Sequence, residues 1–264
     1  MGELKKRVLA ASILAPFVAA LFYFLPDPGF FALIALVVLL AFYEIVHMAH
    51  VPGKYLLIAL ALVSLTPLYS KAFDFYLLCL IASPLIYLLF LLFNRAGDRQ
   101  DVNRDIVTGI AAQLFGGVFI VLPLFAVYLL KQLSSLFPLV LLLTIWASDT
   151  CAYFLGKKFG RRPLAPQISP KKTYEGLIGA ILGSMAVICL SHRLLHFGMA
   201  ASLGIGAAMG VLGQAGDLLE SMGKRVLHRK DSSSLIPGHG GILDRIDSFI
   251  FTAPLLYICT AWKG

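Results

Sequence analysis

Four aspartates in the second half of the chain lie in or beside apolar runs: Asp149, Asp217, Asp244 and Asp247. Asp244 and Asp247 are three residues apart, a spacing that puts two side chains on one face of a helix. A carboxylate in an apolar segment is costly unless it faces a cation, another partner or water. Carboxylate oxygens suit Mg²⁺, which commonly also contacts substrate phosphates. The pattern predicts a metal site for phosphate chemistry, with Asp149 as either a ligand or a buried partner for a base.

Two lysines stand immediately before a predicted helix start. Lys171 and Lys172 are followed by Thr173, and Glu175 falls in the expected first turn. A hydroxyl residue followed by an early acid is typical of a helix N-terminus. Lysines beside such a terminus make an anion site, because their charge adds to that of the free backbone N–H groups. We therefore expect Lys171 and Lys172 to bind a phosphate.

A second basic segment follows Asp217. Ser221 and Lys224 come four and seven residues later, so an acid, a hydroxyl and a base share one helix face. The next loop contains Gly238-His239-Gly240-Gly241. Its glycines let the backbone approach a ligand closely and present N–H groups to phosphate oxygens. Acids, bases and the glycine loop all fall at one predicted membrane face, which indicates phosphate chemistry at a membrane surface.

These residues are carried by a very apolar chain. Of its 264 residues 59% are apolar and 14% charged, whereas soluble domains average about 45–50% and about 25%. A soluble enzyme and a disordered chain are excluded.

Apolar runs recur throughout the sequence. They predict a single all-α domain, a polytopic integral membrane protein with about nine transmembrane helices. Residues 1–135 would supply the N-terminal helices and 136–264 the catalytic helices and cytoplasmic loops. The predicted spans are 8–25, 30–48, 55–70, 73–93, 106–130, 136–156, 174–195, 200–220 and 242–262.

The distribution of basic residues predicts the orientation. With a cytoplasmic N-terminus, 18 of the 22 Lys and Arg residues fall inside, and only Lys71, Lys131, Arg193 and Lys263 fall outside. This asymmetry follows the positive-inside rule. It predicts a cytoplasmic N-terminus and active site, an external C-terminus, and an uncleaved first helix. It also accounts for the net charge of +8 without a nucleic-acid partner.

The remaining polar features receive structural interpretations. Glu44 and His47 are three residues apart on the second span and are interpreted as an interfacial pair near its cytoplasmic end. The four cysteines lie inside apolar runs without a C-x-x-C pair, so they are interpreted as core residues.

A long segment resembles the motif of the phosphatidate cytidylyltransferases, also called CDP-diacylglycerol synthases. It is Ser221-x-x-Lys224-Arg225-x4-Lys230-Asp231-x5-Pro237-Gly238-His239-Gly240-Gly241-x-x-Asp244-Arg245-x-Asp247. The stretch Ser169-Pro170-Lys171-Lys172-Thr173-x-Glu175-Gly176 and the surroundings of Asp149 are also similar to the family. The first half of the chain resembles it only as generic apolar helices.

The resemblance implies a multispanning homodimer that uses Mg²⁺, as one or two ions, to convert CTP and phosphatidic acid into CDP-diacylglycerol and pyrophosphate. The lipid would enter from the membrane with its acyl chains still in the bilayer. The expected catalytic residues are Asp217, Lys224, His239, Asp244 and Asp247. The expected metal ligands are Asp217, Asp244, Asp247 and Asp149. The expected substrate contacts are Ser169, Lys171, Lys172, Thr173, Glu175, Ser221, Arg225, Lys230, Asp231, Gly238, Gly240, Gly241 and Arg245.

Charge considerations indicate how such a reaction would proceed. A phosphomonoester carries close to two negative charges at neutral pH, so the lipid phosphate needs no strong general base. The obstacle is its repulsion from the triphosphate, which metal ions must reduce. We expect the helix start at Lys171 and Lys172 to bind the lipid phosphate, and Lys224 with Arg225 to bind the triphosphate.

Other activities fit parts of the pattern. A CTP-dependent polyprenol kinase would use similar groups but transfer the γ-phosphoryl group, and related lipid cytidylyltransferases would differ in their lipid. An ion-coupled transporter would place its charges near the bilayer midplane in repeated halves. Here the charges gather at one face, and no internal repeat is evident.

Overall fold

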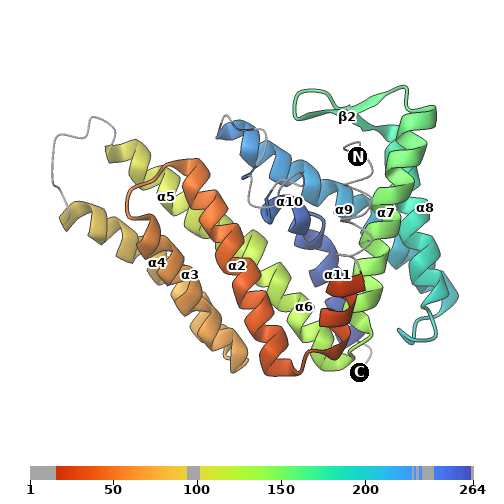
Figure 1. The fold of residues 1–264 in the computed structure, drawn as a ribbon, viewed down its shortest axis with the longest axis horizontal. Coiled ribbons are helices and arrows are strands. Elements are labelled where there is room, and N and C mark those ends of the chain that lie inside the picture. The colour runs from red at the N-terminus through yellow and green to blue at the C-terminus, as the bar shows by residue number, and fades with distance from the viewer. Residues whose placement is uncertain (1–15, 94–101, 228, 230–231, 234–240, 263–264) are drawn as a thin grey trace, which may run out of the picture.

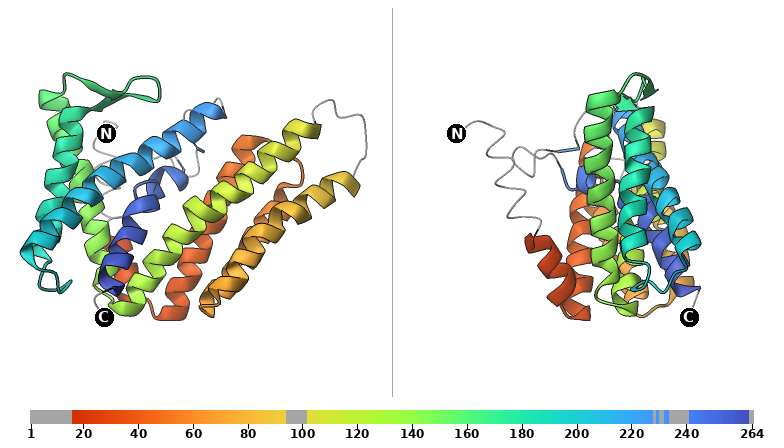
Figure 2. Two further views of the ribbon diagram at one scale, coloured as in Figure 1. Left: turned by 180° about the vertical axis from the view of Figure 1, so that it is seen from behind. Right: turned by 90° about the vertical axis from the view of Figure 1, so that its right-hand side faces the viewer.

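The computed structural model describes residues 16–93, 102–227, 229, 232–233 and 241–262. It is a bundle of helices with a small β-hairpin at one end (Figure 1). The hairpin and two neighbouring helices, α7 and α8, form one side of the bundle, and α3 and α4 form the other (Figures 1 and 2). The last helix, α11, finishes at the end of the bundle opposite the hairpin (Figure 2).

The first half of the described chain is entirely helical between its turns. Residues 16–24 form a helix. Lys71 adopts a left-handed conformation with φ 58°, so the third and fourth predicted spans are separate helices joined by a tight turn. The other helices are α2 (Asp27–Ala49), α3 (Lys54–Tyr69), α4 (Phe73–Phe93), α5 (Val102–Gly116), η1 (Gly117–Val121) and α6 (Leu122–Leu133).

The segment η1 is a π-helical turn inside one continuous helical rod. The Leu122 N–H reaches back five residues to the Gly117 carbonyl, which also accepts a hydrogen bond from the Tyr76 hydroxyl at 2.8 Å. Pro123 follows at the start of α6 and has no N–H to continue the ordinary pattern. The fifth predicted span is therefore one rod with a local irregularity.

The second half combines helices with a hairpin that the sequence analysis did not anticipate. Its elements are α7 (Phe137–Phe159), β1 (Pro163–Ala165), β2 (Ser169–Thr173), α8 (Tyr174–Leu190), α9 (Met199–Val226), α10 (Leu243–Ile246) and α11 (Phe249–Ala261). The strands pair antiparallel, with Ala165 opposite Ser169. Lys171 and Lys172 therefore lie on a strand that ends immediately before the predicted helix start at Tyr174. The ninth predicted span is divided, because Asp247 and Ser248 interrupt it between α10 and α11.

The helices agree with an all-α polytopic membrane protein. Five helical segments are long and apolar enough to cross a membrane: Asp27–Ala49, Phe73–Phe93, Asn103–Leu133, Phe137–Phe159 and Met199–Val226. Two shorter apolar helices, Lys54–Tyr69 and Tyr174–Leu190, accompany them. The second to eighth predicted spans each coincide with a helical segment, while most of the first lies outside the described residues. The count of nine stays a prediction.

Glycines allow α7, α8 and α9 to pack closely. A Cβ atom at Gly183 would lie 2.5 Å from the Ala147 carbonyl oxygen of α7. One at Gly210 would lie 2.5 Å from the Ile181 Cα atom of α8. Only a residue without a side chain permits such close approach of two backbones. These glycines fix α9, which carries much of the candidate site, against α8 and α7.

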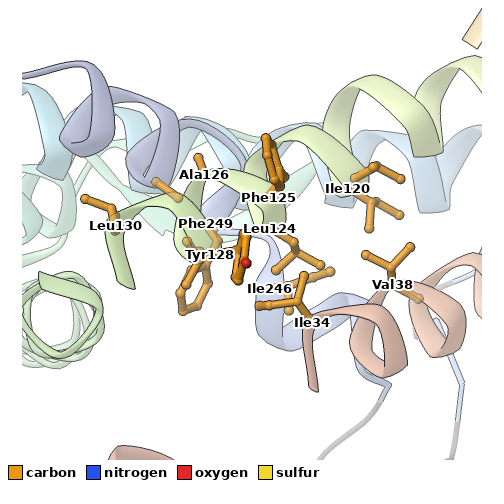
Figure 3. Packing of buried hydrophobic residues seen from close by; sticks show 14 of the residues in the cluster. Ile34, Val38, Ile120, Leu124, Phe125, Ala126, Tyr128, Leu130, Ile246 and Phe249 are labelled. Carbon is orange, nitrogen blue, oxygen red and sulfur yellow. The ribbon is translucent and has the colours of Figure 1, made fainter. Parts of the chain in front are cut away.

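The main core lies between α2, α6 and the last two helices. Ile34 and Val38 of α2 face Leu124 of α6, and Ile246 and Phe249 complete the cluster (Figure 3). Lipid is as apolar as these side chains, so close van der Waals contact between them stabilises the packing and specifies how the helices meet. The core thus joins α10 and α11, at the end of the chain, to α2 near its beginning.

Lys131 is buried, although the charge distribution had placed it in an external turn. Its Nζ donates to the carbonyl oxygens of Phe22 and Tyr23, each at 2.7 Å, and lies 5.6 Å from the centre of the Phe30 ring. These carbonyls belong to the last turn of the first described helix, where unpaired acceptors attract a cation. Lys131 therefore fastens that helix to α6.

Candidate active site

Three carboxylates converge where α9 meets the start of α11. Asp217, Glu220 and Asp247 each offer an oxygen, and these oxygens lie within 4.8 Å of one another. Asp217 and Glu220 share a face because they are three residues apart on α9. Asp247 reaches the same point because the chain turns between α10 and α11. We call these three residues the carboxylate cluster.

The carboxylate cluster keeps one buried oxygen without a partner in the described part of the chain, although Lys172 and Lys224 pair with two of its acids. The Glu220 side chain is 1% exposed, and its Oε1 atom has no hydrogen-bond partner among the residues that the structure describes. Burial, with the neighbouring charge of Asp217, raises the pKa of Asp247. Like charges so close favour a proton or a bound cation between them. The donor set, carboxylate oxygens only, is the one that Mg²⁺ prefers.

Lys224 lies between the carboxylate cluster and Asp244. Its Nζ is 2.6 Å from Glu220 Oε2 and 2.5 Å from Asp244 Oδ1. The other Asp244 oxygen accepts hydrogen bonds from Gly241 N and Ser232 Oγ, each at 2.9 Å. Burial alone would raise the pKa of Asp244, but these donors outweigh it and hold that pKa at about 2.

Asp244 is therefore a partner of Lys224 and is not part of the carboxylate cluster. The sequence analysis expected Asp244 and Asp247 to act on metal from one helix face. Instead α10 ends at Ile246, and the two aspartates engage different neighbours. Glu220, which the sequence analysis did not select, takes the place expected for Asp244. Its spacing from Asp217 and Lys224 on α9 was the available signal.

Lys172 brings the hairpin to the carboxylate cluster. Its Nζ lies 2.6 Å from Asp217 Oδ2 and 3.5 Å from the Gln214 carbonyl oxygen. The Ser221 hydroxyl donates to the other Asp217 oxygen at 3.2 Å. Lys171, its neighbour on the strand, is exposed. The structure thus places Lys172 and Ser221 at the site as expected, and it separates the two lysines.

Asp149 and Arg245 lie in the electrostatic neighbourhood of the same acids. Asp149, on α7, is close enough to two other acids, Asp217 and Asp247, for their charges to interact. Its charge also interacts with those of Lys172 and Arg245. Asp149 is exposed on its helix and so remains open to a ligand. Both sequence-based alternatives, a metal ligand or a partner for a base, fit this position.

Other expected substrate contacts have structural partners instead. Thr173 caps α8 by accepting a hydrogen bond from Gly176 N at 3.1 Å. Glu175 accepts from the backbone N–H groups of Arg161 and Arg162 at 3.1 and 3.5 Å. Both therefore hold the hairpin on α8, as the predicted helix start requires.

The remaining expected contacts divide into two groups. Arg225 is exposed and donates to the Ile168 and Arg229 carbonyl oxygens, each at 3.4 Å, while Ser169 is half-buried on β2. Gly241 is buried, and a Cβ atom there would overlap Ser232 Oγ and the Glu44 carboxylate. Five residues lie outside those that the structure describes: Lys230, Asp231, Gly238, His239 and Gly240.

Glu44 is placed differently from its sequence-based interpretation. It is fully buried, whereas His47 is exposed and stacks on Tyr43 with ring centres 5.7 Å apart. Glu44 accepts hydrogen bonds from the site's own residues, beginning with Ser233 Oγ at 2.7 Å. The expected interfacial pair with His47 is therefore wrong.

A cavity adjoins the site on the side of the N-terminal helices. It has a volume of about 830 Å³ and lies between α2, α5 and α9. Its walls are mainly apolar, with Ala111 and Phe115 from α5. Glu220 and Lys224 line it where it meets the site, and Arg104 adds a second base. The cavity suits a molecule with a long apolar part and an anionic head.

Fold and site define a class of protein: an apolar helical bundle in which lysines meet a carboxylate cluster beside an apolar cavity, an arrangement suited to phosphate chemistry. The chain belongs to the Cytidylyltransferase family, which it matches over residues 5–262. The family resemblance seen in the motif is thereby confirmed, and so is the prediction of a nucleotidyltransferase.

Individual relatives agree with this assignment. The chain is 30% identical to the phosphatidate cytidylyltransferase of Thermotoga maritima over 269 residues, covering 98% of this chain and 96% of that protein. It is 40% identical to the phosphatidate cytidylyltransferase of Aquifex aeolicus over 137 residues, about half of each chain at 51% and 52%. The protein of that name from Bacillus subtilis is 45% identical over 119 residues, 44% of each chain. These relatives support CTP-dependent synthesis of CDP-diacylglycerol, as predicted.

Proposed function

We propose that the carboxylate cluster and its two lysines transfer CMP from CTP to phosphatidic acid, releasing CDP-diacylglycerol and pyrophosphate. An oxygen of the lipid phosphate would attack the α-phosphorus of CTP as the bond from that phosphorus to the pyrophosphate breaks. The observation that carries this proposal is the convergence of Asp217, Glu220 and Asp247 within 4.8 Å, beside Lys172 and Lys224. Carboxylates and ammonium groups so arranged serve phosphoryl chemistry by neutralising charge.

The carboxylate cluster would hold the metal. Asp217, Glu220 and Asp247 are the proposed ligands, with Asp149 as a further candidate on α7. The orphaned Glu220 oxygen and the all-oxygen donor set fit a hard divalent cation such as Mg²⁺. When bound there, Mg²⁺ would neutralise charge on the α-phosphoryl group and on the departing pyrophosphate.

The lysines would bind and orient the two anions on either side of the carboxylate cluster. Lys172 and Lys224 are both partly buried, with side chains 15% and 12% exposed, so water screens their charges only in part. Neither substrate phosphate requires a strong base, because the lipid phosphomonoester is already nearly dianionic. Asp244 would keep Lys224 charged and in place.

The cavity between α2, α5 and α9 would receive the lipid. Its apolar walls suit the acyl chains, and Lys224 at its inner end suits the phosphate. Arg104 would add charge near the head group. The lipid could then react without leaving the membrane environment.

Orientation and assembly are part of the proposal. The positive-inside bias supports a cytoplasmic N-terminus and active site, so that CTP enters from the cytoplasm. The homodimer rests on the family resemblance. The glycines at residues 116–117 and 179–183 pack against Phe42, Leu80 and α7 within the chain, so these close contacts are intramolecular.

Product analysis tests the proposed reaction. The full-length protein is incubated in mixed micelles with Mg²⁺, phosphatidic acid and CTP carrying labels in the α- and γ-phosphates. We expect the α-label in CDP-diacylglycerol and the γ-label in pyrophosphate. A γ-label transferred to lipid would indicate a kinase and overturn the proposal.

Variants of the carboxylate cluster test its role in metal binding. Glu220→Gln and Asp247→Asn should each lower turnover at least about 100-fold and raise the Mg²⁺ concentration needed for half-maximal rate. Asp244→Asn should lower turnover while leaving that concentration unchanged. Asp27→Asn, on an exposed first turn of α2, is the matched acid control. Normal Mg²⁺ dependence in Glu220→Gln would contradict the assignment.

A further inference from the structure

Glu44 lies in the interior of α2, far along the chain from the motif residues. Its side chain is fully buried, next to the buried Ile45 and Val46. A buried carboxylate persists only where hydrogen bonds or a cation satisfy it. Both of its oxygens are in fact occupied by donors from the second half of the chain.

Four donors from the described part of the chain meet this one carboxylate. Oε1 accepts from Ser233 Oγ at 2.7 Å and from Ile242 N at 2.8 Å. Oε2 accepts from Ser232 Oγ and from Leu243 N, each at 2.9 Å. Two donors precede residues 234–240 in the chain, and two follow them. A single side chain on α2 therefore holds both edges of the segment that carries the glycine–histidine motif.

The same contacts continue to the lysine of the site. Ser232 Oγ lies 2.9 Å from Asp244 Oδ2 as well as from Glu44 Oε2. A hydroxyl group has one proton to donate, so Ser232 joins the two carboxylates through a shared hydrogen bond. Asp244 in turn holds Lys224. A connected polar network thus runs from α2 to the edge of the carboxylate cluster.

We propose that Glu44 is a positioning residue: it joins Ser232 and Ser233 to the start of α10 and, through Ser232 and Asp244, sets the position of Lys224. This role rests on the proposed function of Lys224. Glu44 itself contacts no residue of the carboxylate cluster among the contacts described above, so it acts through its neighbours. It also explains why the N-terminal half of the chain, generic in its apolar pattern, is required by the site.

A carboxylate is needed at this position because all four neighbours are donors. Glutamine would turn an NH₂ group toward N–H or hydroxyl donors on one side, leaving at least one buried donor without an acceptor. Aspartate would keep the charge but is one methylene shorter, so it would not reach both edges. The two substitutions separate the requirement for charge from the requirement for reach.

The test compares Glu44→Gln and Glu44→Asp with wild type, using the full-length protein in mixed micelles. We expect a fall in kcat of roughly 10- to 100-fold for Glu44→Gln, with the Mg²⁺ concentration for half-maximal rate unchanged. Glu44→Asp should recover part of the lost rate. His47→Gln, an exposed position one turn away on α2, is the control and should retain normal turnover. Full activity in Glu44→Gln would overturn the proposal.

A double-mutant cycle with Ser232→Ala distinguishes positioning from general stability. If Glu44 acts through Ser232, Ser232→Ala should slow the wild type about 10-fold but slow Glu44→Gln by less than about 2-fold. Two independent effects would multiply instead, and that result would also overturn the proposal.

Hydrogen exchange gives a second measurement that does not depend on turnover. The amides of Ile242 and Leu243 should exchange faster in Glu44→Gln, at least about 10-fold, while amides in the middle of α6 remain unchanged. Unchanged exchange at these amides would contradict the contact. If wild type failed to form CDP-diacylglycerol, the proposed function would fall, whereas this exchange result would still report on Glu44.

Discussion

Lys172 on strand β2 lies 2.6 Å from Asp217 on α9, so the hairpin is fastened to the carboxylate cluster by one ion pair. Lys224 occupies a different position: it pairs with Glu220 and Asp244 and lines the cavity between α2, α5 and α9. Lys172 is not among the residues that line this cavity. The two lysines therefore pair with different acids of the carboxylate cluster and differ in their access to the cavity, so each can serve a different anion.

This placement leads us to predict the opposite division of labour from the one expected from the sequence. The assignment of Lys172 to the lipid phosphate rested on its position just before the start of α8, but the structure places Lys172 on β2 and pairs it with Asp217. We predict that Lys224→Ala mainly raises the KM for phosphatidic acid and that Lys172→Ala mainly raises the KM for CTP. Loss of one charge-assisted contact should lower kcat/KM about 10- to 150-fold for the affected substrate. The measurement is the KM of each substrate with the other saturating.

Lys171→Ala is the control for this experiment. It lies beside Lys172 on the same strand but is exposed, and it should change both constants by less than about 3-fold. If Lys172→Ala and Lys224→Ala affected both substrates equally, the two anions would share one basic region, and the assignment of separate sides would be wrong.

The helical architecture was predictable because membrane helices leave long apolar runs in the sequence. The fourth predicted span, 73–93, coincides with α4, Phe73–Phe93. The hairpin was missed because its strands are only three and five residues long and neither shows an alternation of apolar and polar residues. The break at Asp247 was missed because an apolar run reveals its length but not a turn within it.

The site was predictable at the level of residue types but not of partners. Helix spacing and the motif together predicted Asp217, Lys224 and Asp247 at one place, and the structure brings these residues together. It could not reveal that Asp244 pairs with Lys224, since spacing places side chains on a helix face only while the helix continues. Glu44 lies far from the motif in the chain, and only the folded structure brings the two together.

Gly216 is predicted to control the position of Asp247. A Cβ atom at Gly216 would overlap the Asp247 carbonyl oxygen, so Gly216→Ala must move the turn between α10 and α11. Displacing a ligand by about 1 Å can cost a factor of about 100 in rate. We expect turnover to fall roughly 10- to 100-fold. In an activity titration, the Mg²⁺ concentration needed for half-maximal rate should rise.

Gly204→Ala provides the control on the same helix. A Cβ atom there has no neighbour within 4 Å among the residues described. Alanine also favours a helix more than glycine does, so this variant should be as stable as wild type or more stable. Equal loss of activity in both variants would show that α9 does not tolerate alanine for reasons unrelated to Asp247.

The ion pair of Asp244 predicts a stability change at low pH. Burial opposes ionisation, but Lys224, Gly241 and Ser232 lower the pKa of Asp244 from 3.8 to about 2. Because the folded pKa is below the unfolded one, its stabilising contribution is complete above about pH 4 and is lost as the pH falls through about 2. The contribution at neutral pH is about 2 kcal/mol.

Thermal unfolding in detergent between about pH 2 and pH 6 measures this effect. Asp244→Asn should lower the melting temperature at neutral pH, and the difference from wild type should shrink as the pH falls toward 2. Asp74→Asn, an exposed position in the first turn of α4, is the control. A difference between wild type and Asp244→Asn that stays constant over this range would contradict the ionised pair.

Narrowing the cavity should impair use of the lipid alone. Ala111 on α5 lines the cavity, and Ala111→Phe would fill part of its 830 Å³ volume. We expect the KM for phosphatidic acid to rise about 5- to 50-fold, more for long acyl chains than for short ones, because the lost space is apolar. The KM for CTP should remain within about 2-fold.

Leu114→Phe is the control for this experiment. It adds a ring to an exposed α5 position outside the cavity lining and should leave both constants unchanged. A rise in the KM for CTP that matched the rise for phosphatidic acid would show that this cavity does not distinguish the two substrates.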